Sequence, residues 1–450
     1  MGAAAPRPEH HVDPGEPNVT TTPVSGADWD GAPAIAAALA HAAERPQPTA
    51  LLVVGLLGLD AVRGIDGRAA AAAAVAEVRA RLAGLDAEGV TVVPLDADSI
   101  ALVCPGHDQH EAIRLAERVV EVVGAPIDGT RSARLSANVG VAMAIAAPVG
   151  AEALVRDADT ALVAAASRGP GSVEAFGPGL RDGLAARMGT AVDLAEALAK
   201  EGELFLSYQP VFDLEHDTIV GAEALVRWRH PQRGVVSPAD FIPVAEQTGL
   251  IADLGCWVLD AAVSQLSQWQ RLVGTGFRLH VNLSPLEMRQ PRLVAQVVDA
   301  LDRHGVPAEQ LLLEITETGL MTADDGSVPR LEELREIGVA LGIDDFGTGY
   351  SSISYLRELP VDMVKLDRSL TSLVAASPDE YALTRAIFGL MRSSGLEIVA
   401  EGIEEHVQVA HLRAIRCRYG QGYLLARPAG PEVVAALLAR RGQGSRPSGM

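Results

Sequence analysis

The chain has 450 residues, and 58 Asp and Glu against 37 Lys and Arg give it a formal net charge of −21. A chain this acidic has no general electrostatic attraction for a DNA or RNA polymer or for an anionic membrane. Hydrophobic residues make up 48% of the sequence, so wholesale disorder is excluded. No apolar run approaches the ~20 residues of a membrane span, and the N-terminus lacks a signal-peptide core. The composition therefore predicts a cytoplasmic protein with no membrane span.

Lysine and cysteine are both scarce. Among the 37 basic residues only Lys200 and Lys365 are lysines, so each is a candidate for a specific role. The cysteines, Cys104, Cys256 and Cys417, are widely spaced and form no C-x-x-C pair. We expect reduced, buried thiols and neither a disulfide framework nor a zinc site.

The N-terminal part of the sequence predicts an arm followed by a mixed α/β domain. Residues 1–46 are rich in Ala, Pro, Gly and Thr with little periodicity, so we expect a disordered arm. Residues 47–178 alternate apolar runs with helical patterns, which favours a small α+β sandwich. Strands are expected at 51–59, 91–94, 99–103 and 134–145, and helices at 68–85, 109–123 and 151–167.

The rest of the chain predicts a linker helix, a barrel and a tail. Residues 179–202 place apolar side chains at helical spacing, as in an amphipathic helix that serves either packing or signalling. Short apolar strands then alternate with helical segments, at 204–208, 219–226, 277–283, 311–315, 339–343, 363–366, 397–400 and 422–425. Over residues 203–438 this pattern matches an α/β fold of the (β/α)8 TIM-like barrel type. Residues 439–450 predict a flexible tail.

Polar side chains recur at the strand ends of this barrel, where the βα loops build active sites. In chain order they are Glu223, Asn282, Glu314, Asp344, Asp345, Lys365 and Glu401. Strand alternation cannot aim both Asp344 and Asp345 inward, so one of them must lie at a frayed strand end.

These carboxylates would repel one another and would be strongly penalised by burial. Oxygen ligands from Asp, Glu and Asn suit Mg²⁺ or Mn²⁺, and two such cations bind a phosphate oxygen and generate hydroxide. Each residue alone has an ordinary explanation, such as a solvated carboxylate, an ion pair or, for Asn282, a helix cap. Their joint occurrence on successive strand ends favours a site for two divalent cations, Mg²⁺ or Mn²⁺.

The same segments carry a family resemblance. Residues 203–438 resemble the EAL-domain phosphodiesterases that hydrolyse cyclic di-GMP, with the signature Glu223-Ala224-Leu225 inside GAEALVRWRHP. The match continues through YQPVFDL, SPADFIPVAEQTGLI, HVNLSP, LLLEITET, DDFGTGYSSISYLRELPVDMVKLD, IVAEGIE and QGYLLARP. The resemblance implies hydrolysis of one phosphodiester bond to give linear pGpG, and a homodimer formed through the EAL domain.

The resemblance also implies a role for each residue that matches a family motif. The ligands of the first cation would be Glu223, Asn282, Glu314 and Asp344, and those of the second Asp344 and Asp345. Besides Glu223, the catalytic candidates are Lys365 and Glu401, the latter beside the attacking water. The dinucleotide would contact Gln209, Arg227 and Gln421, together with Asp345. Glu317 matches the glutamate that steadies the DDFGTGYSS loop.

The N-terminal domain is similar, more faintly, to the GGDEF diguanylate cyclase fold. SANVGVAMA and VRDADTALVAAASRGPGSVEAF resemble that family's later strand and final helix. The signature position, however, reads Asp96-Ala97-Asp98-Ser99-Ile100, and Gly55 and Leu57 replace metal-binding aspartates. Without paired acids to hold Mg²⁺ on GTP, we expect a catalytically inactive, regulatory domain.

Two other functions stay open. The barrel could bind cyclic di-GMP as a sensor without turnover and act through protein partners, although a sensor does not need the metal ligands. It could also be a protein-interaction module, although Gln209, Arg227 and Gln421 at matching positions argue against that.

Overall fold

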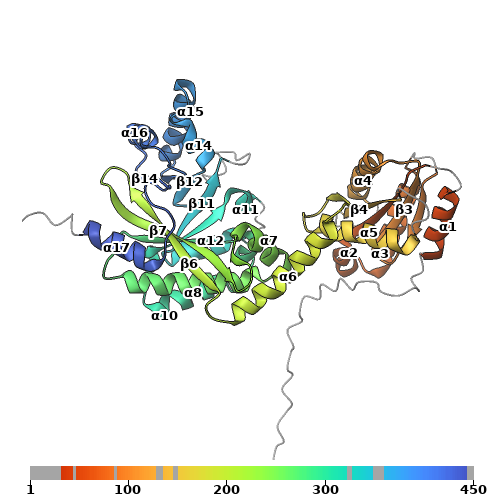
Figure 1. Ribbon diagram of the computed structural model, residues 1–450, viewed down its shortest axis with the longest axis horizontal. Coiled ribbons are helices and arrows are strands. Elements are labelled where there is room, and N and C mark those ends of the chain that lie inside the picture. Colours follow the sequence, from red (N-terminus) through yellow and green to blue (C-terminus); the bar gives the residue numbers. More distant parts are fainter. Residues whose placement is uncertain are drawn as a thin grey trace, which may run out of the picture. The chain divides into compact units, whose positions relative to one another are not determined.

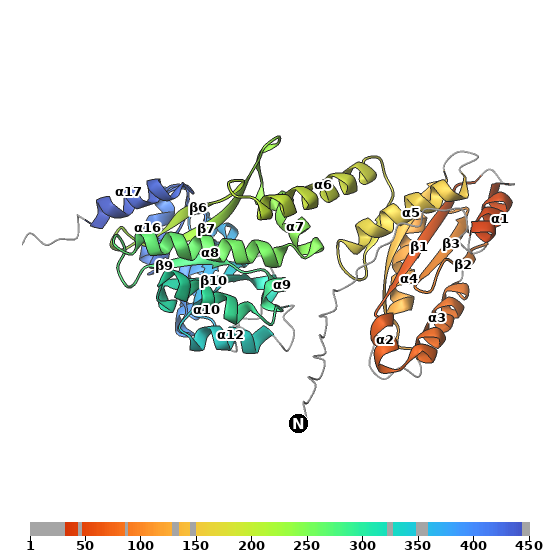
Figure 2. The same ribbon diagram turned by 90° about the horizontal axis from the view of Figure 1, so that it is seen from below.

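The structure is a computed structural model that describes residues 32–43, 47–85, 89–127, 135–144, 150–321, 327–347 and 359–442. The chain divides into two compact units, Met1–Ala185 and Ala186–Met450, each with its own sheet (Figures 1 and 2). The division falls within helix α6 (Leu180–Ala199), which occupies most of the segment predicted as a linker helix. In the described part of the chain, no helix is both long and apolar enough to cross a bilayer.

The first unit is a five-stranded sheet with helices on both faces. In the spatial order β2-β3-β1-β4-β5, its strands are β2 (Thr91–Pro94), β3 (Ser99–Pro105), β1 (Thr49–Leu57), β4 (Ser136–Ala144) and β5 (Val173–Ala175). Its helices are α1 (Ala32–Ala43), α2 (Leu59–Ile65), α3 (Arg68–Ala83), α4 (Gln109–Gly124) and α5 (Ala151–Ala166). Leu52 of β1 packs in the core beneath α3 and α4, and Leu51 packs in the core beneath α1 and α5. The strand is therefore apolar throughout because both of its faces are covered.

Residues 32–43 form α1, so the prediction of a disordered arm over 1–46 is wrong for this segment. Ile35 is fully buried and packs with Leu51 and Val53 of β1, and Leu39 packs on the same cluster. The helix is built almost entirely from alanine around these two side chains, which stand four residues apart on one face.

The second unit is an eight-stranded barrel with a ninth, short strand paired to it. Its strands are β6 (Leu204–Asp213), β7 (Thr218–His230), β8 (Gly234–Val236), β9 (Arg278–Asn282), β10 (Leu311–Thr316), β11 (Ala340–Phe346), β12 (Met363–Leu366), β13 (Glu397–Ala400) and β14 (Tyr419–Gly420). The pairing of β6 with both β7 and β14 closes the ring, and β8 is the strand outside it. The predicted barrel is confirmed.

Two details of the predicted barrel are wrong. β6 and β7 follow each other directly as an antiparallel pair, without an intervening helix, and β6 is also antiparallel to β14. The connection is a tight turn in which the Asp213 carboxylate accepts hydrogen bonds from the backbone of Glu215 and His216 at 2.9 and 3.0 Å. The eighth barrel strand is Tyr419–Gly420, whereas the predicted strand at 422–425 is a turn closed by a 3.0 Å bond from Leu425 N to Gly422 O.

Helices surround the barrel (Figure 1). The longer ones are α7 (Pro238–Thr248), α8 (Ile251–Trp269), α10 (Leu293–His304), α12 (Ser327–Glu336), α15 (Pro378–Ser393), α16 (His406–Ala414) and α17 (Pro431–Gly442). The shorter ones are α9 (Pro285–Met288), α11 (Glu317–Met321), α14 (Arg368–Leu373) and the 3₁₀ helix η1 (Ala308–Gln310). The tail predicted from residue 439 onward thus begins inside α17, and its last residues, 443–450, lie outside the described ranges.

A small apolar cluster, the lumen floor, lies toward the N-terminal ends of the parallel barrel strands. It consists of Val211, Leu312, Ala340, Met363 and Val399. The larger core lies between the barrel and its helices and includes the fully buried Trp228. The buried carboxylates Glu223, Glu314 and Asp344 lie toward the opposite end, where the parallel strands finish.

All three cysteines are free. Burial raises the pKa of the Cys104 and Cys417 thiols to about 12, as predicted for buried thiols. The same prediction is wrong for Cys256, which is only half-buried on α8.

Candidate active site

The predicted polar residues meet at the C-terminal ends of the parallel barrel strands. Their positions are Glu223 on β7, Asn282 on β9, Glu314 on β10, Asp344 on β11, Lys365 on β12, and Glu401 and Gln421 directly after β13 and β14. The strand register sets Asn282 opposite Glu314, and Asp344 opposite Thr316. Neighbouring strands thus bring together residues that are far apart in the sequence.

Lys365 is the centre of this group. Its Nζ lies 2.8 Å from Glu401 Oε1, 3.0 Å from Glu314 Oε2, and 3.1 Å from both Glu223 Oε2 and Asp344 Oδ1. The side chain is 1% exposed. Because an ammonium has three N–H bonds, it cannot hydrogen-bond four carboxylates at once. Asp344 Oδ1 is in charge contact with the lysine but is left buried without a hydrogen bond.

The surrounding charges fix the protonation of Lys365. Burial alone would lower its pKa, but the four carboxylates, Asp344 foremost, outweigh burial and hold the pKa well above its usual value. These contacts favour the charged form of the lysine.

For two of the carboxylates, burial outweighs the attraction of Lys365 and favours the protonated form. Burial raises the pKa of Glu314 well above its usual value, and raises the pKa of Glu401 to about 8, in both cases against the attraction of Lys365. For Glu223, burial also acts to raise the pKa, but Lys365 and hydrogen-bond donors outweigh it and lower the pKa. One lysine is thus not enough to ionise the whole group.

Glu223 is clamped by two amides. Asn282 Nδ2 donates to its Oε1 at 2.9 Å, and Gln421 Nε2 donates to its Oε2 at 2.9 Å. Both oxygens of the carboxylate are therefore fixed in direction, and the carbonyl oxygen of Asn282 stays available as a ligand.

The carboxylates form two groups that share one member. Oxygens of Glu223, Glu314 and Asp344 lie within 4.8 Å of one another, and so do oxygens of Asp344, Asp345 and Glu401. Asp344 is buried, whereas Asp345 is exposed and has a φ of 54°. The left-handed backbone at Asp345 brings its carboxylate beside the site although strand alternation turns it away.

Glu317 lies directly after β10 as the first residue of α11, and it is buried. Its Oε2 accepts a hydrogen bond from the backbone N of Gly347 at 2.9 Å. This bond holds the start of the segment that follows β11, as expected for a loop-stabilising residue. The remainder of the DDFGTGYSS motif, from residue 348, lies outside the described residues.

Gln209 and Arg227 are not bonded to the lysine centre. Gln209 pairs with Glu223 in the register of β6 and β7, but its Nε2 donates to the backbone O of Ala426 at 3.2 Å. The half-buried Arg227 lies four residues beyond Glu223 on β7 and donates to the backbone O of Val226 at 2.8 Å. Both lie on strands that carry the site, and neither has a charged partner among the hydrogen bonds and ion pairs of the described residues.

The donor set fits divalent cations. Five carboxylates face one ammonium, so an excess of negative charge remains that two divalent cations would offset. The buried Asp344 Oδ1 and Gln421 Oε1 have no hydrogen-bond partner. Hard oxygen donors with unsatisfied lone pairs are the ligands that Mg²⁺ and Mn²⁺ prefer.

His280 is a site residue that sequence reasoning did not assign. Its Nδ1 lies 2.7 Å from Glu314 Oε1, and the ring is 2% exposed. Burial, reinforced by the charge of Lys365, lowers its pKa to about 3, so the imidazole is neutral. The available signal was strand alternation, which places His280 on the same face as Asn282.

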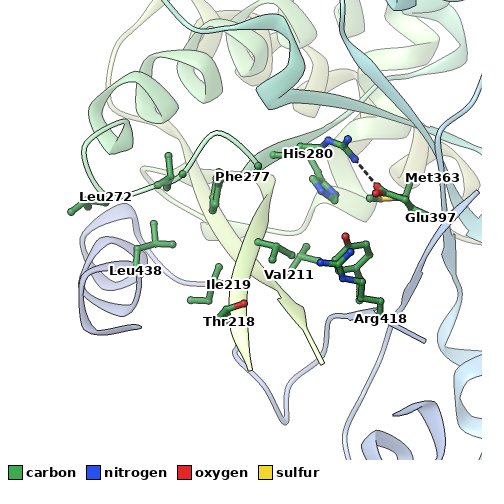
Figure 3. Close-up of a pocket in the computed structure, with 16 residues that line it drawn as sticks. Val211, Thr218, Ile219, Leu272, Phe277, His280, Met363, Glu397, Arg418 and Leu438 are labelled. Atoms are coloured by element: carbon green, nitrogen blue, oxygen red, sulfur yellow. Dashed lines mark hydrogen bonds and ion pairs between the residues drawn. The ribbon is translucent and has the colours of Figure 1, made fainter. Parts of the chain in front are cut away.

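A cavity of about 530 Å³ lies at the other end of the barrel. Figure 3 shows Leu272, Phe277 and Leu438 along one side of it, and Arg418 and Glu397 on the other. His280 also lines this cavity, so its ring separates the cavity from the carboxylates.

The N-terminal unit has acidic side chains at the turn between β2 and β3, where the GGDEF-like signature was expected. Arg63 of α2 is ion-paired with Asp98 of this turn and with Asp60. In the described residues, the clusters of three possible metal ligands all lie in the barrel unit.

Comparisons with known proteins agree with this geometry. The EAL domain family model matches residues 191–428. The chain is 35% identical over 391 residues to the bifunctional diguanylate cyclase/cyclic di-GMP phosphodiesterase MucR of Pseudomonas aeruginosa, covering 87% of this chain and 57% of MucR. It is 37% identical over 333 residues to cyclic di-GMP phosphodiesterase NbdA of the same organism, covering 74% and 42%. The chain thus spans about half the length of such curated relatives.

Solved structures match the barrel. The phosphodiesterase PaMucR in complex with c-di-GMP is 41% identical, with a TM-score of 0.52 over 55% of this chain and 99% of that one. The EAL enzyme Bd1971, bound to cAMP and cyclic di-GMP, is 30% identical, with a TM-score of 0.54 over 57% and 69%. The alignment with MucR extends into the N-terminal region, but no GGDEF family model matches there, so that resemblance stays a prediction.

Proposed function

The chain belongs to the EAL domain family, and on that premise we propose that it hydrolyses cyclic di-GMP to linear pGpG with two divalent cations, Mg²⁺ or Mn²⁺. The observation that carries the proposal is the buried Lys365 with four carboxylates around its Nζ at 2.8–3.1 Å. Relatives named as cyclic di-GMP phosphodiesterases, such as NbdA, support the substrate.

Cations bound by Glu223, Asn282, Glu314, Asp344 and Asp345 would polarise the phosphodiester and activate water. Lys365 then acts as a fixed positive charge that holds these carboxylates in one arrangement and balances charge on the phosphate. Glu401, 2.8 Å from Lys365, orients the attacking water. The carboxylates hold the pKa of Lys365 well above its usual value, which supports a role as a fixed charge.

The dinucleotide is expected to contact Gln209, Arg227, Gln421 and Asp345. Arg227 has the only formal positive charge of this set, and its guanidinium is half-exposed on β7. An arginine suits the planar, bidentate recognition of a phosphate or a guanine edge. Homodimerisation through the barrel and a regulatory N-terminal unit remain parts of the proposal.

The test uses the purified full chain, cyclic di-GMP and either Mg²⁺ or Mn²⁺, with product separated by chromatography. We expect pGpG to form, to stop when a chelator removes the metal, and to resume when Mn²⁺ is restored. Tight binding without pGpG under every metal condition would instead identify a sensor. No binding at all would point to an interaction module.

A further inference from the structure

The carboxylate of Glu314 is divided between two partners. Its Oε2 accepts a hydrogen bond from Lys365 Nζ at 3.0 Å, and its Oε1 lies 2.7 Å from His280 Nδ1. Glu314 is 1% exposed, and no other hydrogen bond to its side chain appears among the described residues. The direction of this buried carboxylate therefore depends on the lysine on one side and the histidine on the other.

The histidine can supply a directional donor to Glu314 from a distance of 2.7 Å. A Glu314 carboxylate that binds a cation would be ionised, and next to it a ring proton would belong on Nδ1. Lys365 already has four acidic neighbours, so a second cation is not what the site lacks. What Glu314 needs is a directional donor that leaves its negative charge intact for a metal ion.

The surroundings of the ring keep it in this orientation. On the far side of the ring, a Cβ atom built on Gly221 would lie 3.2 Å from His280 Nε2 and 2.6 Å from the backbone O of Arg278. The glycine therefore leaves room for the imidazole between β7 and β9. The ring also lines the cavity at the opposite end of the barrel (Figure 3).

We propose that His280 is a positioning residue, which donates from Nδ1 to Glu314 Oε1 and thereby aims the carboxylate at the first divalent cation. Carboxylates that bind metals are themselves held by hydrogen bonds, and losing such a hydrogen-bond partner typically reduces metal affinity about 10–100-fold. The inference rests on the proposed metal site, and its test is a binding measurement that does not require turnover.

The experiment compares two substitutions of His280 in the full chain. His280→Asn keeps an N–H donor close to the position of Nδ1, whereas His280→Leu fills similar space without one. Mn²⁺ is titrated into metal-free protein, and free Mn²⁺ is measured by electron paramagnetic resonance. We expect His280→Leu to raise the Mn²⁺ Kd about 10–100-fold, and His280→Asn to stay within about threefold of the native protein, because the donor and not the ring is what matters.

A matched control addresses general damage to the barrel. His304 on α10 also pairs with a carboxylate, with its Nε2 3.0 Å from Asp260 Oδ1, but it lies outside the site. His304→Leu is expected to leave the Mn²⁺ affinity unchanged. If His280→Leu fails to fold, the Mn²⁺ affinity of His280→Asn and the ¹⁵N spectrum described next still test the role of His280.

The tautomer gives a second readout that a packing role would not produce. In Mg²⁺-loaded protein labelled with ¹⁵N at histidine, the proposal requires a proton on His280 Nδ1. A ring protonated only at Nε2, native Mn²⁺ affinity in His280→Leu, or equal losses in the Leu and Asn variants would each overturn it. If Mn²⁺ binds as expected but pGpG never forms, the proposed hydrolysis fails while the role of His280 stands.

Discussion

The two units differ in what they bury. Within the described part of Met1–Ala185, the buried polar side chains are those of Thr49 and Asn138, and neither is charged. The barrel unit buries Glu223, Glu314 and Lys365 near the lumen axis. A fold can be stabilised by apolar packing alone, and replacing a buried ion pair by apolar groups is often neutral or stabilising. Charge buried in only one of two well-packed units therefore marks a site and not a requirement of folding.

The acids of the two units also differ in how they are neutralised. In the first unit, Asp98 at the β2–β3 turn is held by Arg63, a cation built into the chain. In the barrel, four carboxylates contact Lys365 and a fifth, that of Asp345, lies beside Asp344 and Glu401. The first acid thus has a partner within the chain, whereas the second group would be completed by the proposed divalent cations. The predictions below test this difference, from the largest expected effect to the smallest.

The largest effect is expected for Glu223→Gln. The substitution keeps the shape of the side chain but removes a negative charge that faces Lys365 and two amide donors. Turnover of cyclic di-GMP should fall by about 10³-fold, beyond the 10–100-fold loss typical of an outer-shell partner. The matched control is Glu397→Gln on β13 at the other end of the barrel, where the carboxylate pairs with Arg278 at 2.6 Å. Equal losses of turnover in the Glu223→Gln and Glu397→Gln variants would contradict an active site at the C-terminal ends of the strands.

Lys365→Arg should be nearly as damaging although it preserves the charge. The ammonium contacts four carboxylates from one point, whereas a guanidinium is planar and larger and cannot occupy the same cage. Turnover measured at saturating Mn²⁺ should drop about 10²-fold. Native rates in this variant would remove the positioning role assigned to Lys365.

Divalent cations should stabilise one unit and not the other. At about 100 times its Kd, Mn²⁺ is expected to raise the free energy of unfolding of the barrel by about 2.7 kcal/mol. Hydrogen exchange should slow in β7, β10 and β12 and stay constant in β1 and β4 of the first unit. Equal protection of both units would mean that the two are coupled or that the ions bind elsewhere.

The smallest effect concerns Asp159 in the first unit. Burial, with a smaller contribution from Asp96, raises the pKa of Asp159 to about 6. The folded state thus keeps this proton to higher pH than the unfolded chain does, so the unit loses stability as pH rises from about 4 to 6. Asp159→Asn should remove this dependence and add roughly 1 kcal/mol at pH 7, after allowance for solvent screening. Hydrogen exchange of β4 amides at pH 4.5 and 7 measures both the pH dependence of stability and the gain in the Asp159→Asn variant. Equal protection of the native protein at the two pH values would contradict the raised pKa of Asp159.

The polar residues around Lys365 could be predicted from the sequence by simple rules. Glu314 and Lys365 are single charges inside apolar strands, and parallel strands bring their C-terminal ends to one edge. Alternation also showed that Asp344 and Asp345 cannot both point inward. It could not show which one does, because the answer lies in the φ of 54° at Asp345.

Other features depend on information that a sequence pattern does not contain. Hydrophobic periodicity does not report strand direction, so the antiparallel pairing of β6 and β7 was hidden. The short strand at Tyr419–Gly420 has too few residues to show alternation. The role of His280 depends on a contact with Glu314 across 34 residues, and a histidine on a strand carries no sign of such a partner.

The clamp on Glu223 has a consequence for synthesis of the chain. Gln421 reaches Glu223 across 198 residues, and β14 closes the ring against β6. A nascent chain on the ribosome can complete the first unit early, since domains tend to fold as they emerge. The barrel cannot close until β14 has been translated. A product terminated before β14 lacks the last strand of the ring and the Gln421 contact to Glu223.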